Sequence, residues 1–132
     1  MKRTRTLIVE NHAPFRTAVE HWLKDFAAIE VAGSCATDCS TLPASAGQGV
    51  DLLLVGLGTS GQGDFELARR LKADLQARKL VLMSLFPLAE AAAAAVPTGV
   101  DAVVSKTGIF YELPALLVAM FDRSPEAGAP AV

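Results

Sequence analysis

The chain is poor in cysteine and in aromatic residues, and it contains no long uninterrupted apolar run. Its two cysteines, Cys35 and Cys39, have no histidine or second cysteine pair at metal-ligand spacing, so we expect reduced structural thiols. No apolar stretch approaches the ~20 residues that a membrane-spanning helix requires, and the amino terminus lacks the layout of a signal peptide. We therefore expect a cytoplasmic protein without a membrane segment.

The chain also lacks an excess of basic residues. It has 12 Lys and Arg against 14 Asp and Glu, a formal net charge of −2, and no stripe of Lys or Arg along any predicted helix. Such a balance gives little attraction to a phosphate backbone, so we expect no direct binding of nucleic acid. The short basic start, Lys2-Arg-Thr-Arg5, is interpreted as a solubilising lead-in to the first strand.

With 132 residues, 52% of them hydrophobic, the chain is long enough to bury one core. We expect one domain over residues 1–123 and a disordered tail of small and polar residues over 124–132. Within the domain, β-type apolar runs alternate with helical patterns, which indicates crossover units and a parallel sheet. The predicted strands are 6–10, 29–34, 51–57, 79–84 and 101–105.

Helical spacing predicts the helices between these strands. Residues 15–26 and 65–75 give the clearest patterns, 38–47 is interrupted by Pro43, and 88–96 contains five consecutive alanines. In the last helix, residues 110–121, one set of side chains is predicted to face the core: Phe110, Leu113, Leu117 and Met120. A second set is left near the rim as a candidate contact surface: Tyr111, Leu116 and Phe121.

Polar or special residues stand where four of the strands end. In an open parallel sheet these carboxyl ends face one crevice, so the residues are expected to meet there. They are Glu10, Asn11, Gly56, Ser84 and Lys106. Glu10 is the obvious partner for a partly buried Lys106, and a salt bridge between them is favoured over an anion held by Lys106 and Ser84.

These motifs resemble the receiver domain of bacterial two-component response regulators, over roughly residues 5 to 122. The segment Val9-Glu-Asn-His-Ala-Pro-Phe-Arg16 is similar to the first motif of receivers that precede a LuxR-type helix-turn-helix domain, and Ser84, Gly99 and Lys106 stand at family positions. His12 within this motif is predicted to form a local hydrogen bond. The resemblance implies a flavodoxin-like (βα)5 doubly wound parallel sheet, with strand order 2-1-3-4-5 in three α/β/α layers.

The chain departs from the family at the residues that carry its chemistry. A typical receiver takes a phosphoryl group on an aspartate at the position of Gly56, beside Mg²⁺ held by that aspartate and an acidic pair. Here glycine offers no nucleophile, and Asn11 replaces one acid, which leaves Glu10. Val103 stands at the position of the aromatic switch residue. We therefore expect a degenerate phosphorylation pocket with no metal, no cofactor and no enzymatic activity.

The resulting interpretation is a stand-alone pseudo-receiver that acts independently of phosphorylation as a protein-protein interaction module. Its partner would be a histidine kinase, another response regulator or a second copy of itself. The expected contact surface comprises Ala91, Ala95, Tyr111, Leu116 and Phe121.

Two alternatives stay open. The first is a receiver phosphorylated on a displaced acceptor, for which Thr59, Ser60 and Asp64 are the candidates. The second is a small-anion or nucleotide sensor at the loop 56–63, because Gly56-Leu-Gly-Thr-Ser-Gly61 satisfies a glycine-rich phosphate-binding pattern. That pattern lies on the wrong βα unit for a dinucleotide site, and no Walker lysine accompanies it.

Overall fold

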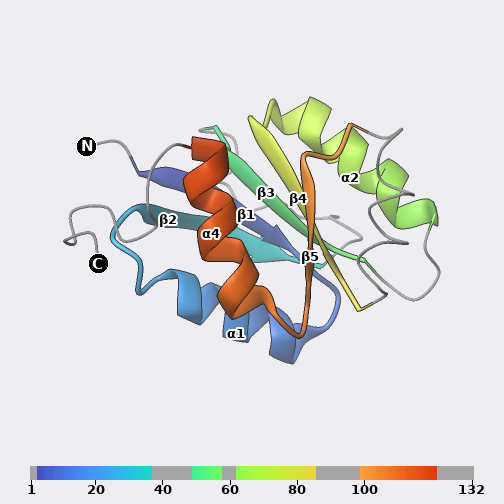
Figure 1. Ribbon diagram of the computed structural model, residues 1–132. Helices are drawn as coiled ribbons and strands as arrows, with labels where there is room; N and C mark the ends of the chain where they lie inside the picture. The colour runs from blue at the N-terminus through green and yellow to red at the C-terminus, as the bar shows by residue number, and fades with distance from the viewer. Residues whose placement is uncertain (1–2, 37–48, 58–61, 86–98, 122–132) are drawn as a thin grey trace.

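A computed structural model describes residues 3–36, 49–57, 62–85 and 99–121. Its centre is a five-stranded parallel sheet with the order β2-β1-β3-β4-β5 (Figure 1). This order is the one that the receiver resemblance implies, and it confirms the predicted fold class. The strands are β1 (Thr4–Val9), β2 (Ile29–Cys35), β3 (Leu52–Gly56), β4 (Lys79–Ser84) and β5 (Ala102–Ser105).

Three described helices cover the sheet: α1 (Ala13–Leu23), α2 (Gln62–Leu75) and α4 (Ile109–Phe121). Figure 1 shows α1 and α4 on one face of the sheet and α2 on the other, so the sheet is the middle of three layers. The helices predicted at 38–47 and 88–96 and the tail at 124–132 lie outside the described residues. None of the described helices has the length and apolarity that crossing a membrane requires.

The core forms two clusters, one on each face of the sheet. Side chains from alternate positions of β1 and β3 enter opposite clusters, because successive residues of a strand point to opposite faces. Every residue of β3 is buried, as expected for a central strand covered by helices on both sides. On α2, Ala68 and Leu71 are buried and Phe65 and Leu75 pack beside them, so this face of the predicted helix covers the sheet.

The last helix corrects one prediction. Phe110 was predicted to face the core, but it is 46% exposed and its ring packs edge-on against Trp22 with the centroids 4.8 Å apart. The buried stripe instead begins one residue earlier, with Ile109, Leu113 and Leu117 at a spacing of four. The helix has the predicted spacing of buried residues, but it begins at Ile109, one residue before the predicted start, directly after Gly108.

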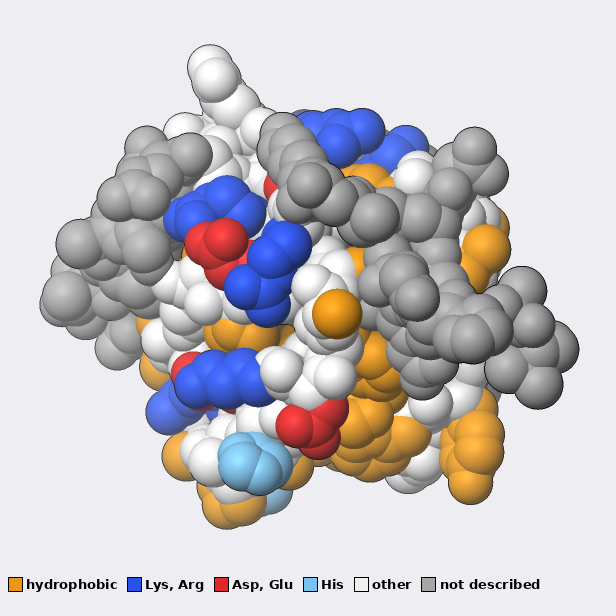
Figure 2. Space-filling model, turned by 90° about the vertical axis from the view of Figure 1, so that its left-hand side faces the viewer, with side chains coloured by type: hydrophobic (Ala, Val, Ile, Leu, Met, Phe, Trp, Pro, Cys, Tyr) orange, Lys and Arg blue, Asp and Glu red, His pale blue; other side chains and the backbone are white. Residues whose placement is uncertain are grey.

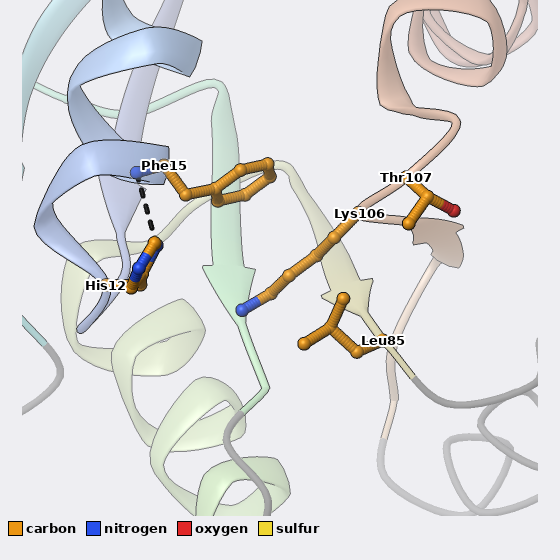
Figure 3. A pocket seen from close by; sticks show the side chains of 5 residues that line it. All are labelled: His12, Phe15, Leu85, Lys106 and Thr107. Carbon is orange, nitrogen blue, oxygen red and sulfur yellow. Dashed lines mark hydrogen bonds between the residues drawn. The ribbon is translucent and has the colours of Figure 1, made fainter.

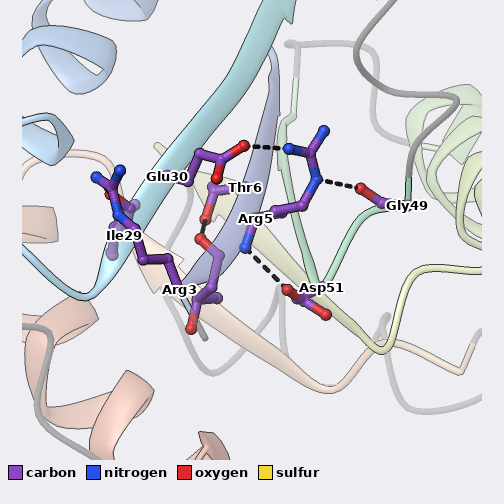
Figure 4. A network of polar contacts seen from close by, with 8 residues as sticks. Arg3, Arg5, Thr6, Ile29, Glu30, Gly49 and Asp51 are labelled. Carbon is purple, nitrogen blue, oxygen red and sulfur yellow. Dashed lines mark hydrogen bonds and ion pairs between the residues drawn. The ribbon is translucent and has the colours of Figure 1, made fainter. Parts of the chain in front are cut away.

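The basic start of the chain also differs from its interpretation as a solubilising segment. Arg3 donates to the backbone carbonyls of Ala27 and Ile29. Arg5 donates to the carbonyl of Gly49 and pairs with Glu30 (Figure 4). These contacts tie β1 to β2 and to the segment that leads into β3. The two arginines therefore fix the amino-terminal edge of the sheet.

Two aspartates serve the same edge. Asp51 accepts the backbone N–H of Arg5 at 2.9 Å, and Asp101 accepts the backbone N–H of Leu80 at 2.7 Å. Each carboxylate lies just before its own strand and satisfies a donor of the neighbouring strand. They thereby hold the strand starts level, so that the carboxyl ends of the strands meet on the opposite side.

Candidate functional site

The carboxyl ends of β1, β3, β4 and β5 meet at one edge of the sheet, as the sequence predicts. Glu10 directly follows β1, Gly56 ends β3, Ser84 ends β4, and Lys106 directly follows β5. Glu10 and Ser84 are buried, and the backbone N–H of Lys106 donates to the carbonyl of Ser84 at 2.8 Å. The strand ends thus bring residues that are up to 96 positions apart, Glu10 and Lys106, into direct contact.

The Glu10 carboxylate fills the space above Gly56. A Cβ atom at residue 56 would lie 1.7 Å from Oε1 of Glu10 and 2.5 Å from its Cδ. Non-bonded carbon and oxygen atoms do not approach so closely, so no side chain at residue 56 is compatible with this position of Glu10. The sequence has glycine at residue 56, and the structure shows that the Glu10 carboxyl lies where a side chain at this position would begin.

Glu10 and Lys106 form the predicted salt bridge. Oε1 of Glu10 lies 2.7 Å from Nζ of Lys106, and the two side chains are 3% and 9% exposed. Oε2 accepts the backbone N–H of His12 at 2.9 Å, while the carbonyl of Glu10 accepts from Arg16 at 2.6 Å. Both carboxylate oxygens are therefore engaged, one by a cation and one by the backbone at the start of α1.

The remaining predicted site residues lie differently. Asn11 is exposed, so it does not share the buried environment of Glu10. Val103, at the predicted switch position, is half-buried, pairs with Leu82 in the sheet and packs against the cluster on the α2 face. Thr59 and Ser60 lie outside the described residues, as does most of the glycine-rich loop.

The residues at the strand ends do not fit the Mg²⁺ ion that a receiver uses. Mg²⁺ requires near-octahedral oxygen ligands and usually takes carboxylates from the protein. Glu10 is the acid that the strand ends retain, and its two oxygens already face Lys106 and an N–H group. Among the described residues, no group of three or more His, Cys, Asp or Glu could hold a metal ion. The described part of this crevice therefore supplies no divalent-cation site.

A cavity of about 430 Å³ opens beside this pair and was missed by the sequence reasoning. The described residues that line it are His12, Phe15, Leu85, Lys106 and Thr107 (Figure 3). They come from the start of α1 and from the segments that follow β4 and β5. The sequence feature that could have indicated this cavity is Leu85, a large apolar residue directly after β4. Leu85 is 67% exposed.

The predicted contact surface is described only in part. Ala91 and Ala95 lie outside the described residues. Tyr111 is 87% exposed, whereas Leu116 and Phe121 are half-buried and pack against the core. On the face in Figure 2, Lys and Arg side chains of the described residues lie next to Asp and Glu side chains and form no uninterrupted basic stripe. Arg5 pairs with Glu30, and Lys24 pairs with Glu20.

Comparisons with known proteins bear on the fold. A scan against protein-family models and a search of curated proteins found no match. Among solved structures, the RcsB response regulator of Salmonella typhimurium superimposes with a TM-score of 0.71 at 14% identity, covering 92% of this chain and 61% of that chain. This chain thus spans about three-fifths of that regulator.

Two further structures match over most of both chains. The signal receiver domain of the response regulator NarL from Mycobacterium tuberculosis has a TM-score of 0.74 at 18% identity, covering 93% of this chain and 100% of that chain. A LuxR-family two-component response regulator from Aurantimonas sp. SI85-9A1 has a TM-score of 0.69 at 18% identity, covering 93% and 89%. This chain therefore has the fold of a response-regulator receiver domain, including those of the LuxR family.

Proposed function

We propose that this chain is a receiver-fold signalling module that acts without phosphorylation, by binding another signalling protein or a second copy of itself. The observation that carries this proposal is the position of Glu10. Its carboxylate lies where a side chain at residue 56 would begin, and it pairs with Lys106. The groups that receive and neutralise a phosphoryl group in a typical receiver are thus absent or already engaged.

Phosphoryl transfer to a receiver needs a carboxylate that can reach phosphorus in line with the leaving group, and cations that neutralise the developing charge. Glu10 is a carboxylate in the right region, but it is buried and held by a backbone N–H and an ammonium group. Lys106 is already neutralised by this pair. Without a metal to offset the incoming charge, a phosphoryl donor would meet a carboxylate rather than a cation.

Intact mass after incubation with acetyl phosphate and Mg²⁺ tests this proposal. We expect no gain of one phosphoryl group under conditions in which a receiver with an intact aspartate is labelled. Labelling of the wild-type chain at any residue would contradict the proposal and would favour the displaced-acceptor alternative. Peptide mapping would then decide whether Thr59, Ser60, Asp64 or Glu10 carries the group.

A set of variants distinguishes two reasons for the expected lack of labelling: residue 56 has no acceptor side chain, and Glu10 occupies the space that such a side chain needs. Gly56→Asp alone is expected to remain unlabelled, because the new Cβ would begin 1.7 Å from Glu10. Adding Glu10→Asp and Asn11→Asp shortens the overlapping side chain and supplies the acidic pair of a typical receiver. We expect this triple variant to accept a phosphoryl group, and circular dichroism to confirm that both variants are folded.

The interaction partner is proposed to contact the exposed side of α4. Tyr111, Ala115 and Val118 are all exposed and recur at helical spacing, so they form one apolar stripe. Sedimentation over a concentration series will show whether this stripe pairs two copies. Tyr111→Ser with Val118→Ser is expected to weaken the association, and Lys24→Ser, at the residue directly after α1, serves as the exposed control.

The nucleotide-sensor alternative gains no support from the described contacts. A phosphate approaching Gly56 would face the Glu10 carboxylate, which repels it. We also propose that the chain has no enzymatic activity, because residue 56 offers no nucleophile. We propose a cytoplasmic location because the sequence has no apolar stretch of membrane-spanning length and no signal-peptide layout. A histidine kinase or helix-turn-helix gene beside this one would support the signalling role.

A further inference from the structure

We infer that the cavity beside the Glu10–Lys106 pair is a binding site for a small, uncharged, apolar molecule that carries a carbonyl-type hydrogen-bond acceptor. The inference deepens the proposed function by naming an input that could take the place of phosphorylation. It is carried by the cavity and by the donors that face it, and these do not depend on whether the chain can be phosphorylated.

The side chains that line the cavity favour a ligand with a mostly apolar surface. Its 430 Å³ lies within the roughly 300–1,000 Å³ that small-molecule sites occupy. The ring of Phe15 and the side chain of Leu85 lie on opposite sides of the extended Lys106 side chain in Figure 3. The hydroxyl of Thr107 points away from Lys106 and bonds to Ser105 at 2.7 Å. Most of the surface offered to a ligand is therefore hydrocarbon.

The ammonium group of Lys106 supplies the donors. A lysine ammonium has three N–H groups. Among the described residues, its contacts are the Glu10 carboxylate at 2.7 Å and the face of the Phe15 ring, whose centroid lies 5.4 Å away. The side chain is nine-tenths buried, so donors that find no acceptor there are poorly compensated by water. An acceptor brought by a ligand would satisfy them.

His12 supplies a second donor at the rim. Its Nδ1 accepts the backbone N–H of Phe15 at 3.4 Å, so the proton of the neutral ring lies on Nε2. Among the described residues, Nε2 has no hydrogen-bond partner. A single carbonyl oxygen placed between His12 and Lys106 could accept from either side chain.

The charge of the pair decides between a neutral and an anionic ligand. Glu10 already balances Lys106, so a ligand carboxylate would add an unpaired negative charge close to the Glu10 carboxylate. At about 5 Å and an effective dielectric near 20, the two carboxylates repel by roughly 3 kcal/mol. This repulsion and the lost hydration of the ligand carboxylate offset its attraction to the Lys106 ammonium, which Glu10 already shares. A neutral acceptor avoids this repulsion and still satisfies the free N–H groups. Charge balance therefore favours a ketone, ester or amide over a carboxylate.

Three probes of the same shape test the inference: acetophenone, benzoate and α-methylstyrene. They differ in having a neutral acceptor, an anionic acceptor and no acceptor. Binding is followed by two-dimensional NMR titration of the wild-type chain, with the resonances of His12, Leu85 and Thr107 reporting the site. We expect acetophenone to bind at least about fivefold more tightly than each of the others, since one hydrogen bond contributes roughly that factor.

Leu85→Ser is compared with a control substitution of an exposed apolar residue that lies away from the cavity. The control here is Ala119→Ser rather than Val118→Ser, because Val118 belongs to the proposed interaction stripe. Leu85 and Ala119 are both exposed, so neither substitution is expected to unfold the chain, but Leu85 lines the cavity and Ala119 does not. Leu85→Ser is expected to weaken acetophenone binding at least about fivefold through lost apolar contact, and Ala119→Ser to leave it unchanged. Tighter binding of benzoate overturns the neutral-ligand assignment. Absence of millimolar binding, or equal effects of the two variants, overturns the site itself.

Neither of these results bears on phosphorylation, which the intact-mass experiment decides. A chain that gains a phosphoryl group would refute the proposed function and leave the probe titrations standing. A chain that binds no probe would refute the ligand site and leave the unlabelled mass standing.

Discussion

Replacing Lys106 by methionine tests whether the buried ion pair holds the strand ends together. Methionine keeps most of the aliphatic stem that lines the cavity and removes the ammonium group. Glu10 would then remain as a buried carboxylate that keeps its hydrogen bond from His12 and loses its cation. Removing one partner of a buried pair costs about 3–5 kcal/mol, a large part of the roughly 5–15 kcal/mol that stabilises a typical domain.

A double-mutant cycle separates the interaction energy of Glu10 with Lys106 from the cost of leaving one buried charge without its partner. Glu10→Gln removes the charge at the other end, and the double variant Glu10→Gln with Lys106→Met leaves no buried charge at this position. We expect Lys106→Met to lower the free energy of unfolding by about 3–5 kcal/mol and the double variant to recover at least about 2 kcal/mol of that loss. Urea denaturation followed by circular dichroism measures all four free energies of unfolding.

The surface pair Glu20 with Lys24 provides the control cycle within the same chain. It is an i,i+4 pair 3.5 Å apart, with side chains 29% and 60% exposed. Its coupling is expected to be about 0.3–0.5 kcal/mol. If the Glu10–Lys106 coupling is no larger than this, the pair does not hold the strand ends together and the reasoning fails.

Three further substitutions test neighbouring features. Gly56→Ala is expected to lower the free energy of unfolding by at least about 2 kcal/mol in urea denaturation, because its Cβ would force Glu10 out of place. Gly99→Ala is expected to cost about 1–2 kcal/mol in thermal unfolding, since φ is +79° there while the space around the new Cβ is open; a neutral effect would show that this turn relaxes. Asp101→Ala is expected to cost about 1–3 kcal/mol and to speed hydrogen exchange at the Leu80 amide; unchanged exchange would show that this carboxylate does not hold the strand start.

The sheet was predictable because its strands are short, apolar and closed by distinctive residues. The composition of buried apolar runs such as β3 and β4 predicts strands, and the resemblance to receiver domains predicts the strand order. The start of α4 was less well specified. Ile109 and Phe110 are both apolar, and which one faces the core depends on where the helix begins after Gly108, which helical spacing alone does not determine.

The candidate site was predictable as a set of residues and only partly as a geometry. The salt bridge between Glu10 and Lys106 followed from charge and topology, because opposite charges at strand ends that face one crevice must find partners when buried. The overlap of Glu10 with the space above Gly56 did not follow, since it depends on the rotamer of one side chain. The cavity was missed for a similar reason: its walls come from three segments whose spacing no sequence pattern reports.

Glu10 and Gly56 are best understood as a coupled pair of residues. With glutamate at position 10 in this rotamer, any Cβ at position 56 collides with the carboxylate, so glycine is the residue that fits. With glycine at position 56, the space would be empty unless a longer side chain entered it, and an empty space beside Lys106 would leave a buried ammonium group unpaired. The Glu10 rotamer therefore requires glycine at residue 56, and Gly56 leaves the space that the Glu10 carboxylate occupies. It follows that any side chain introduced at residue 56 must also move the Glu10 carboxylate and disturb its pair with Lys106.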